Sequence, residues 1–193
     1  PQAEDDVLDG RRLIIASNRG PVQYSVGKDG GVSARRGGGG LVSAFLALGQ
    51  HTPLTWVASA LSEGDRHVAG LREAARRSVL QSQNGLRVEH IATPPRVYRS
   101  YYNVFSNPFL WFLQHDLGEL VAAMPQAELV RAYEEGYVPV NRAFAARLLQ
   151  EARRSAEPVL ICIQDYHLYL VGGLVRAKVA AAVLQHFVHI PWP

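Results

Sequence analysis

Leu13-Ile14-Ile15-Ala16 is an apolar segment that runs into the polar turn Ser17-Asn18-Arg19, and Gly37-Gly38-Gly39-Gly40 follows about eighteen residues later. The glycines lead directly into a helical pattern over residues 41–48. A strand, a loop and a glycine-led helix suit an anion, because glycine allows close approach and the first helical N–H groups have no internal partner. A flexible linker is the alternative, and the sharp helix start argues against it. The dinucleotide-binding fingerprint requires a short turn between strand and helix, whereas the turn between residues 17 and 40 is long and interrupted.

The bulk composition is that of one soluble domain. The chain has 193 residues, of which 48% are hydrophobic and 19% charged, enough to bury a full core. Its single cysteine, Cys162, excludes an internal disulfide and suits a reducing compartment, so we expect a cytoplasmic protein. No apolar run approaches the length of a membrane span. Residues 1–11 are expected to form a disordered lead, and residues 12–193 the domain.

The charge pattern argues against nucleic acid as a partner. The net charge is only +3, and arginine supplies 18 of the 20 basic residues. These arginines are scattered, often in pairs, and form no basic stripe interleaved with aromatic residues. We therefore expect no nucleic acid among the partners.

Apolar strands alternate with helical patterns along the chain, which predicts a Rossmann-like three-layer α/β domain with a mostly parallel sheet. Asp29-Gly30 lies between two alternating segments and predicts a β-hairpin excursion over residues 22–26 and 31–35. We expect strands over residues 12–17, 54–59, 86–91, 159–163 and 183–189, and helices over residues 39–49, 68–80, 96–114, 126–151 and 168–181.

Several details of these elements are also predicted. Residues 61–66 are expected to form a polar loop, and Asn84-Gly85 a turn. Pro108 is expected to divide the aromatic stretch 96–114 into two helical pieces, some of whose rings should line a cleft. Gly136 and Pro139 are expected to kink the long helix.

The ends of the strands select candidate site residues. In open parallel sheets the ligand crevice lies beyond the carboxyl ends of the strands. Ser17-Asn18-Arg19, Asp165-Tyr166-His167 and His189 all follow predicted strands. An arginine, a carboxylate and two histidines beside a glycine-led helix suit a phosphorylated polar ligand.

Other interpretations of these residues remain. Arg19 could form a structural ion pair, and Asp165 could cap the following helix. His167, His186 and His189 suggest zinc, but His186 and His189 should point to opposite faces of one strand, so we expect no metal. A serine hydrolase is disfavoured because the chain has no nucleophile elbow.

Five motifs together resemble the trehalose-6-phosphate synthase family, whose members are retaining glycosyltransferases with two facing Rossmann domains, the GT-B architecture. The motifs are Ser17-Asn18-Arg19, Gly39-Gly40-Leu41, Tyr101-Tyr102-Asn103-Val104-Phe105-Ser106-Asn107 with Leu110-Trp111, Asp165-Tyr166-His167-Leu168, and His189-Ile190-Pro191-Trp192-Pro193.

The resemblance runs from Leu13 to Pro193 and implies one half of a GT-B fold, the N-terminal acceptor-side domain, with the C-terminal nucleotide-sugar domain absent from this chain. It implies transfer of glucose from a nucleotide-glucose, UDP-glucose above all, to a sugar phosphate, normally glucose 6-phosphate. No cofactor, metal or membrane is implied. An open interdomain face is expected to permit homo-oligomers.

The resemblance also implies roles for individual residues. On the acceptor side, Arg19 and Tyr102 would hold the phosphate, Asp165 would bind sugar hydroxyls, and Trp111 would lie near the reacting sugar. On the donor side, the following residues would contact the phosphates and the sugar near its anomeric centre: Gly39, Gly40 and His189. Asp165 and His189 are thus the implied catalytic residues. Retention by front-face attack would need no protein nucleophile.

The chain also departs from the family pattern. Gln164 stands where the family usually has histidine. Ser59 stands where the family usually has the second tryptophan of Trp-x-Gly-Trp. That tryptophan belongs to the acceptor side, so its loss leaves the identity of the acceptor undetermined. The segment around Ser59 is similar to validoxylamine 7'-phosphate synthase, a pseudo-glycosyltransferase, and glucosylglycerol-phosphate synthases are further relatives. A non-catalytic domain that binds sugar phosphates is another alternative. We expect no appreciable turnover from these 193 residues alone.

Overall fold

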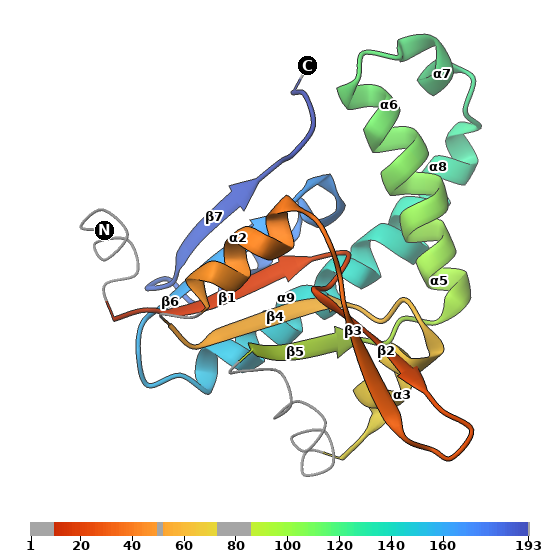
Figure 1. Cartoon of the computed structure of the whole chain (residues 1–193). Helices are drawn as coiled ribbons and strands as arrows, with labels where there is room; N and C mark the ends of the chain where they lie inside the picture. The colour runs from red at the N-terminus through yellow and green to blue at the C-terminus, as the bar shows by residue number, and fades with distance from the viewer. Residues whose placement is uncertain (1–9, 50–51, 73–85, 193) are drawn as a thin grey trace.

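The computed structural model describes residues 10–49, 52–72 and 86–192. Five parallel strands form one sheet in the order β5-β4-β1-β6-β7 (Figure 1). Their bounds are β1 (Arg12–Ser17), β4 (Leu54–Ser59), β5 (Leu86–Ile91), β6 (Val159–Gln164) and β7 (Val183–Phe187). The predicted α/β fold is confirmed. Most of the expected lead, residues 1–9, lies outside the described residues.

The central strand β1 is buried on both faces. Leu13, Ile14, Ile15 and Ala16 are each at most 1% exposed, which explains why the segment is continuously apolar. The chain moves from β1 outward through β4 to β5, and then returns to the other side of β1 with β6 and β7. This reversal between β1 and β6 is the topological switch point at which such sheets bind ligands.

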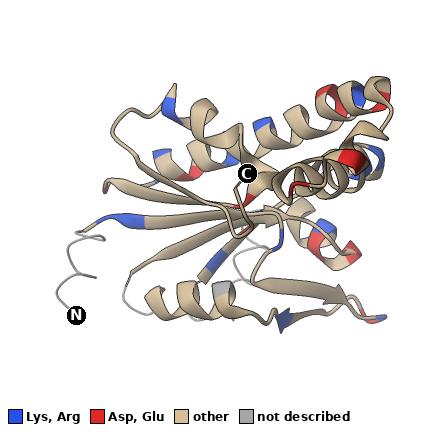
Figure 2. Ribbon diagram, turned by 90° about the horizontal axis from the view of Figure 1, so that it is seen from above, with Lys and Arg blue, Asp and Glu red and all other residues tan. Residues whose placement is uncertain are grey.

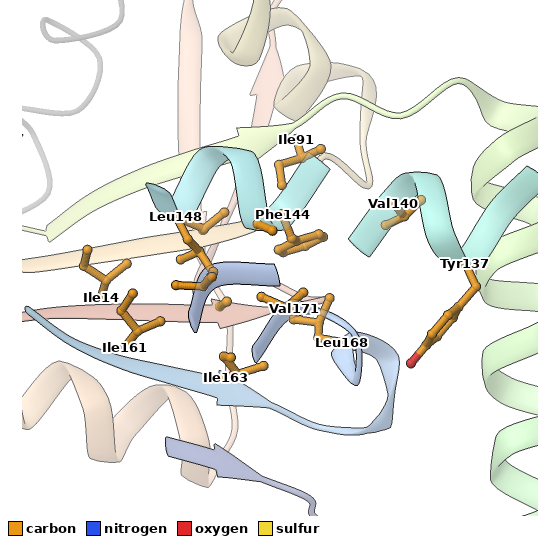
Figure 3. Close-up of a cluster of buried hydrophobic side chains, with 14 of the residues drawn as sticks. Ile14, Ile91, Tyr137, Val140, Phe144, Leu148, Ile161, Ile163, Leu168 and Val171 are labelled. Atoms are coloured by element: carbon orange, nitrogen blue, oxygen red, sulfur yellow. The ribbon is translucent and has the colours of Figure 1, made fainter. Parts of the chain in front are cut away.

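Helices cover both faces of the sheet (Figure 2). On one face, helix α9 (Val138–Arg153) packs Val140, Phe144 and Leu148 into the same buried cluster as Ile14 of β1. Helix α10 (Val171–Arg176) lies beside α9 (Figure 3). The spacing of four residues brings these three side chains onto one side of the helix. Burying each of them stabilises the fold by about 2 kcal/mol.

The opposite face carries the glycine-led helix and the hairpin. Helix α2 (Gly40–Leu48) packs Phe45 edge-on against Trp56 of β4. The hairpin consists of β2 (Val22–Val26) and β3 (Val32–Arg36), whose antiparallel register pairs Val22 with Arg36. Both predictions are confirmed, within one residue at their ends.

The predicted polar loop over residues 61–66 is wrong, because a short helix, α3 (Glu63–Gly70), begins there. Ser62 and Asp65 form a capping box, in which each side chain accepts from the other residue's backbone N–H. Asp65 also accepts from the N–H of Tyr24 at 2.8 Å, which ties the hairpin to α3. A helix was expected over residues 68–80. Among the described residues only the last turn of α3, up to Gly70, agrees with it, because the backbone becomes extended at Leu71. Residues 73–85, with the predicted turn at 84–85, lie outside them.

Pro108 does not divide the aromatic stretch, contrary to expectation. Helix α5 (Pro95–Arg99) continues through the π-helix η2 (Ser100–Leu110) into α6 (Trp111–Gln114). In a π-helix the N–H of residue i bonds to residue i−5, as Trp111 does to Ser106. This wider turn moves away the carbonyl that a proline ring would meet in an α-helix.

The long helix predicted over residues 126–151 also contains a π-helical segment. It consists of α8 (Gln126–Ala132), η3 (Tyr133–Tyr137) and α9, after the short α7 (Gly118–Ala122). Gly136 lies in η3, where the kink was expected, and a Cβ atom there would lie 2.5 Å from the backbone nitrogen of Tyr101. Glycine therefore allows η3 to approach η2 closely.

The helix predicted over residues 168–181 is shorter in the structure. A 3₁₀ turn, η4 (Tyr166–Leu168), precedes α10, which ends at Arg176. Gly172 and Gly173 lower the helix propensity of this segment. A guanidinium N–H of Arg176 donates to the carbonyl of Ala180, which holds the turn that leads to β7.

Candidate functional site

The polar turns after β1 and β6 meet at the switch point, and the segment after β7 joins them. Together they line a cavity of about 180 Å³, the crevice cavity. Four residues predicted for the site, Arg19, Tyr102, Asp165 and His189, all lie there. The complete lining is Ser17, Asn18, Arg19, Tyr102, Gln164, Asp165, His167 and His189.

Asp165 is held in an unusual backbone conformation. Its φ of 71° and ψ of 168° fall in a region that is favourable for glycine and costs other residues roughly 1–3 kcal/mol. Its N–H donates to the carbonyl of Phe187 at 2.7 Å, and its Oδ1 accepts from the backbone N–H groups of Tyr166 and His189. The side chain therefore caps η4, as the alternative interpretation held, and also lines the cavity. Strained backbone of this kind concentrates at functional sites.

A stack of rings forms one wall of the crevice cavity. Tyr102 lies flat between Tyr98 and His167, with centroids 5.5 Å from each, and His167 stacks on Tyr166 at 4.1 Å. Burial lowers the pKa of His167 to about 4, although the nearby Asp165 carboxylate acts in the opposite direction. His167 is thus neutral at physiological pH, and its Nε2 lies 3.3 Å from Oδ1 of Asn107.

The backbone of Arg19 is fixed, whereas its side chain is open. Ser17 Oγ accepts from Trp56 Nε1 and donates to the carbonyl of Arg19, both at 2.7 Å. The guanidinium is exposed and has no ion-pair or hydrogen-bond partner among the described residues. The structural ion pair that the sequence left open for Arg19 is therefore not seen among the described residues. Burial raises the pKa of Tyr98, and the positive charge of Arg19 opposes this shift.

A second cavity of about 540 Å³, the glycine cavity, lies between the glycine run and the hairpin and shares Arg19 with the crevice cavity. Gly39 has a φ of 123°, which glycine readily adopts, and a Cβ atom on Gly38, Gly39 or Gly40 would meet nothing within 4 Å. The start of α2 is therefore open to a ligand. The lining is Arg19, Gly20, Val22, Gln23, Arg35, Arg36, Gly37, Gly38, Gly39, Gly40, Val42, Ser59, Leu61, Asp65 and His90.

The glycine cavity is positively charged. Three arginines line it, and the Asp65 carboxylate is already engaged by the N–H groups of Tyr24, Leu61 and Ser62. Burial lowers the pKa of His90, which favours its neutral form. The arrangement suits an anion at the N-terminus of α2.

The sequence interpretation missed the contribution of the hairpin to this cavity. Arg35 donates to Gln23 Oε1 across the hairpin at 3.1 Å. Arg36, at the end of β3, directly precedes the glycine run. The register of the hairpin, which follows from its turn, was the signal that could have placed both arginines beside the glycines.

Trp111 is not brought to either cavity. It lies on α6, where its ring stacks on His115 with centroids 3.8 Å apart. Its predicted place beside the reacting sugar stays a prediction.

The three histidines considered for zinc make other contacts. Nε2 of His186 lies 3.0 Å from the carbonyl oxygen of Asp165, and Nε2 of His189 lies 2.9 Å from Oε1 of Gln164. Across the described ranges, no three His, Cys, Asp or Glu residues form a group that could hold a metal ion. None of the helices described is long and apolar enough to cross a bilayer.

Residues 11–193 match the model of glycosyltransferase family 20. A trehalose-6-phosphate synthase from Mycolicibacterium smegmatis is 30% identical over 194 residues, which is 100% of this chain and 35% of that protein. A Burkholderia xenovorans α,α-trehalose-phosphate synthase in complex with glucose-6-phosphate superposes with a TM-score of 0.60 at 25% identity, over 94% of this chain and 34% of that one. A structure from E. coli bound with UDP-2-fluoro glucose superposes with a TM-score of 0.64 at 22% identity, over 94% and 34%. The chain thus spans about a third of these relatives.

Proposed function

Since this chain belongs to glycosyltransferase family 20, we propose that it forms the acceptor-side part of an enzyme that transfers glucose from a nucleotide-glucose to a sugar phosphate. The observation that carries the proposal is the meeting of Arg19, Asp165 and His189 at the switch point, next to a cationic cavity at a helix N-terminus. UDP-glucose is the proposed donor, and trehalose 6-phosphate or a similar sugar is the product.

The crevice cavity would hold the acceptor beside Arg19, Tyr102 and Asp165, with the donor sugar beside His189. The exposed guanidinium of Arg19 can bind a phosphate through two parallel hydrogen bonds, and the Tyr102 hydroxyl can donate a third hydrogen bond. Asp165 keeps Oδ2 for sugar hydroxyls, since its hydrogen bonds to the N–H groups of Tyr166 and His189 engage Oδ1. The Burkholderia xenovorans relative, solved with glucose-6-phosphate, supports a sugar phosphate as the acceptor.

The glycine cavity would hold the diphosphate of the donor. The N-terminus of α2 and the guanidinium groups of Arg35 and Arg36 supply positive charge where negative charge grows on the leaving group. These groups perform the charge neutralisation for which other enzymes use a divalent metal, so we propose a metal-free reaction. The E. coli relative bound with UDP-2-fluoro glucose supports a uridine nucleotide.

We propose that the reaction proceeds with retention, by attack on the face from which the diphosphate departs. The acceptor hydroxyl oxygen bonds to the anomeric carbon, the bond from that carbon to the diphosphate oxygen breaks, and the hydroxyl proton passes to the departing phosphate. Asp165 orients the acceptor and His189 contacts the donor sugar, so no side chain needs to form a covalent intermediate.

A different acceptor is the second candidate. Ser59 lines the glycine cavity, is 1% exposed, and donates to Oδ1 of Asn18 at 3.0 Å. A small serine at this wall leaves room that a tryptophan would fill. Through Asn18, which lines the crevice cavity, the change reaches the acceptor side and favours an acceptor other than glucose 6-phosphate, such as the cyclitol phosphate of a pseudo-glycosyltransferase or the smaller acceptor of a glucosylglycerol-phosphate synthase.

The test is an assay of the complete gene product with UDP-glucose and GDP-glucose against a panel of sugar and cyclitol phosphates. We expect nucleotide release that depends on both donor and acceptor, and an α-linkage in the product by NMR. Turnover with no member of the panel, in folded protein, would contradict the proposal. The 193-residue chain alone should be inactive, because the transfer also needs donor contacts from the rest of such an enzyme.

A further inference from the structure

We propose that Gln164 is a positioning residue that fixes which ring nitrogen of His189 is offered to a ligand in the crevice cavity. The inference deepens the proposed function and rests on it only for the identity of that ligand. The hydrogen bond between the two side chains carries it.

Gln164 is held firmly at the carboxyl end of β6. Gln164 is 3% exposed, and it pairs in register with Phe187 of the neighbouring strand β7. His189 follows the end of β7 by two residues, so the parallel pairing of β6 and β7 brings the two side chains to the same edge. Both line the crevice cavity.

Two contacts orient the ring of His189, and a third holds its backbone. Its Nε2 lies 2.9 Å from Oε1 of Gln164, and its backbone N–H donates to Oδ1 of Asp165 at 3.4 Å. Phe187 meets the ring edge-on, with centroids 4.6 Å apart. The side chain is thus held in one orientation before a ligand binds.

The amide oxygen of Gln164 faces the ring and can only accept a hydrogen bond, so this arrangement assigns the proton to Nε2 of His189. In a neutral imidazole the other nitrogen, Nδ1, then has a free lone pair and is an acceptor. A lone pair attracts a hydroxyl group and repels a phosphate oxygen. His189 would therefore select a neutral sugar hydroxyl, which places the sugar of the donor, and not its diphosphate, against this residue.

The direct test measures the ring itself, without substrate. Two-dimensional ¹⁵N NMR of the complete protein at alkaline pH, where imidazole is neutral, reports which nitrogen of His189 is protonated. We expect a protonated Nε2 and a bare Nδ1 in the wild type. Gln164→Leu should yield a mixture of tautomers, and Gln164→Glu, which keeps an acceptor oxygen, should preserve the wild-type pattern.

Gln185→Leu is the matched control, because Gln185 lies on β7 and contacts Cys162 at 3.4 Å. It should leave the spectrum of His189 unchanged. A proton on Nδ1 in the wild type, or an unchanged tautomer in Gln164→Leu, would overturn the inference. Since no turnover is needed, these outcomes are distinguishable from failure of the proposed function.

A kinetic measurement adds a second readout. Gln164→Leu should raise the KM for the nucleotide-glucose about tenfold, the effect of one lost hydrogen bond, and leave the KM for the acceptor within about twofold. Gln164→Glu should recover most of the donor affinity. An equal rise in both KM values would indicate a general loss of structure and would count against a positioning role.

Discussion

The imidazole of His167 lies flat against the phenol ring of Tyr102, with centroids 5.5 Å apart and planes inclined by 12°. The contact joins η4, which follows β6, to the π-helix η2, so it fixes one wall of the crevice cavity. A charged imidazolium in this buried position would lack solvent, which is why burial lowers the pKa of His167 to about 4.

The stability of the protein should therefore decrease in mild acid. The pKa of His167 is about 4 when folded, against 6.5 ordinarily, so the unfolded chain binds this proton first. The free energy of unfolding should fall as the pH drops from about 6.5 to 4, by up to about 3 kcal/mol from this group, and the loss should level off below 4. Urea unfolding across this range measures the effect.

His167→Gln isolates the contribution of this residue. The variant keeps a polar side chain near Asn107 but cannot take up the proton. The lowered pKa of His90 acts in the same direction and remains in both proteins, so the informative quantity is the difference between the two curves. Parallel curves would show that His167 does not cause the acid sensitivity.

Arg19→Ala should abolish turnover that depends on the sugar phosphate. Loss of a charged, two-pronged contact costs about 2–4 kcal/mol, or 30- to 1,000-fold in affinity for the acceptor. Calorimetric titration of the complete protein with the acceptor measures it. Arg96→Ala, at a position 86% exposed and paired with Glu135, is the control and should bind normally. Normal acceptor affinity in Arg19→Ala would refute the assignment.

Asp165→Gly and Asp165→Ala should differ in stability although both lack the carboxylate. Glycine readily adopts the φ of 71° found here, and alanine does not. We expect the glycine variant to be more stable than the alanine variant by about 1–2 kcal/mol, while both lose activity. Thermal unfolding and turnover, measured together, test this. Equal stability of the two variants would show that the backbone is not strained.

Gly136→Ala should destabilise the contact between the two π-helical segments. The added Cβ atom would lie 2.5 Å from the backbone nitrogen of Tyr101, which no side-chain rotation can relieve. We expect a loss of roughly 1–3 kcal/mol in urea unfolding. Gly173→Ala in α10 is the control, because its Cβ atom would meet nothing within 4 Å, and it should be neutral or slightly stabilising.

The buried carboxylate of Glu151 should be more important for stability than any surface ion pair. It is fully buried on α9, 2.9 Å from Arg154 and 3.6 Å from Arg87. Glu151→Gln removes the anion shared by Arg12, Arg87 and Arg154, of which Arg87 keeps Glu89 at 2.8 Å, and should cost about 2–4 kcal/mol. Glu135→Gln removes one half of an exposed pair and should change the free energy of unfolding by less than about 0.5 kcal/mol.

The positions of the strands along the chain and the parallel sheet could be predicted from sequence because their signals are local. The apolar run of β1 and the Asp29-Gly30 turn each specify their own conformation, and the alternation of strands and helices implies the parallel sheet. The strand-end rule then brought Arg19, Asp165 and His189 to one edge, and the structure places all three in one cavity.

What could not be predicted depends on contacts between distant segments. The start of α3 has a local signal, the capping-box pair Ser62 and Asp65, which the sequence interpretation missed, whereas the bond of Asp65 to Tyr24 of the hairpin joins distant segments. The passage of the helix through Pro108 depends on a π-helical turn, for which no sequence periodicity is diagnostic. The ring nitrogen that His189 presents depends on Gln164, 25 residues earlier in the chain.

One side chain, Arg19, is part of the wall of both cavities. Two ligands that occupy them at the same time must share a single guanidinium, so the two binding equilibria cannot be independent. Linkage then requires that each ligand change the affinity of the other by the same factor. Occupancy of one cavity is thereby communicated to the other without any movement of the sheet.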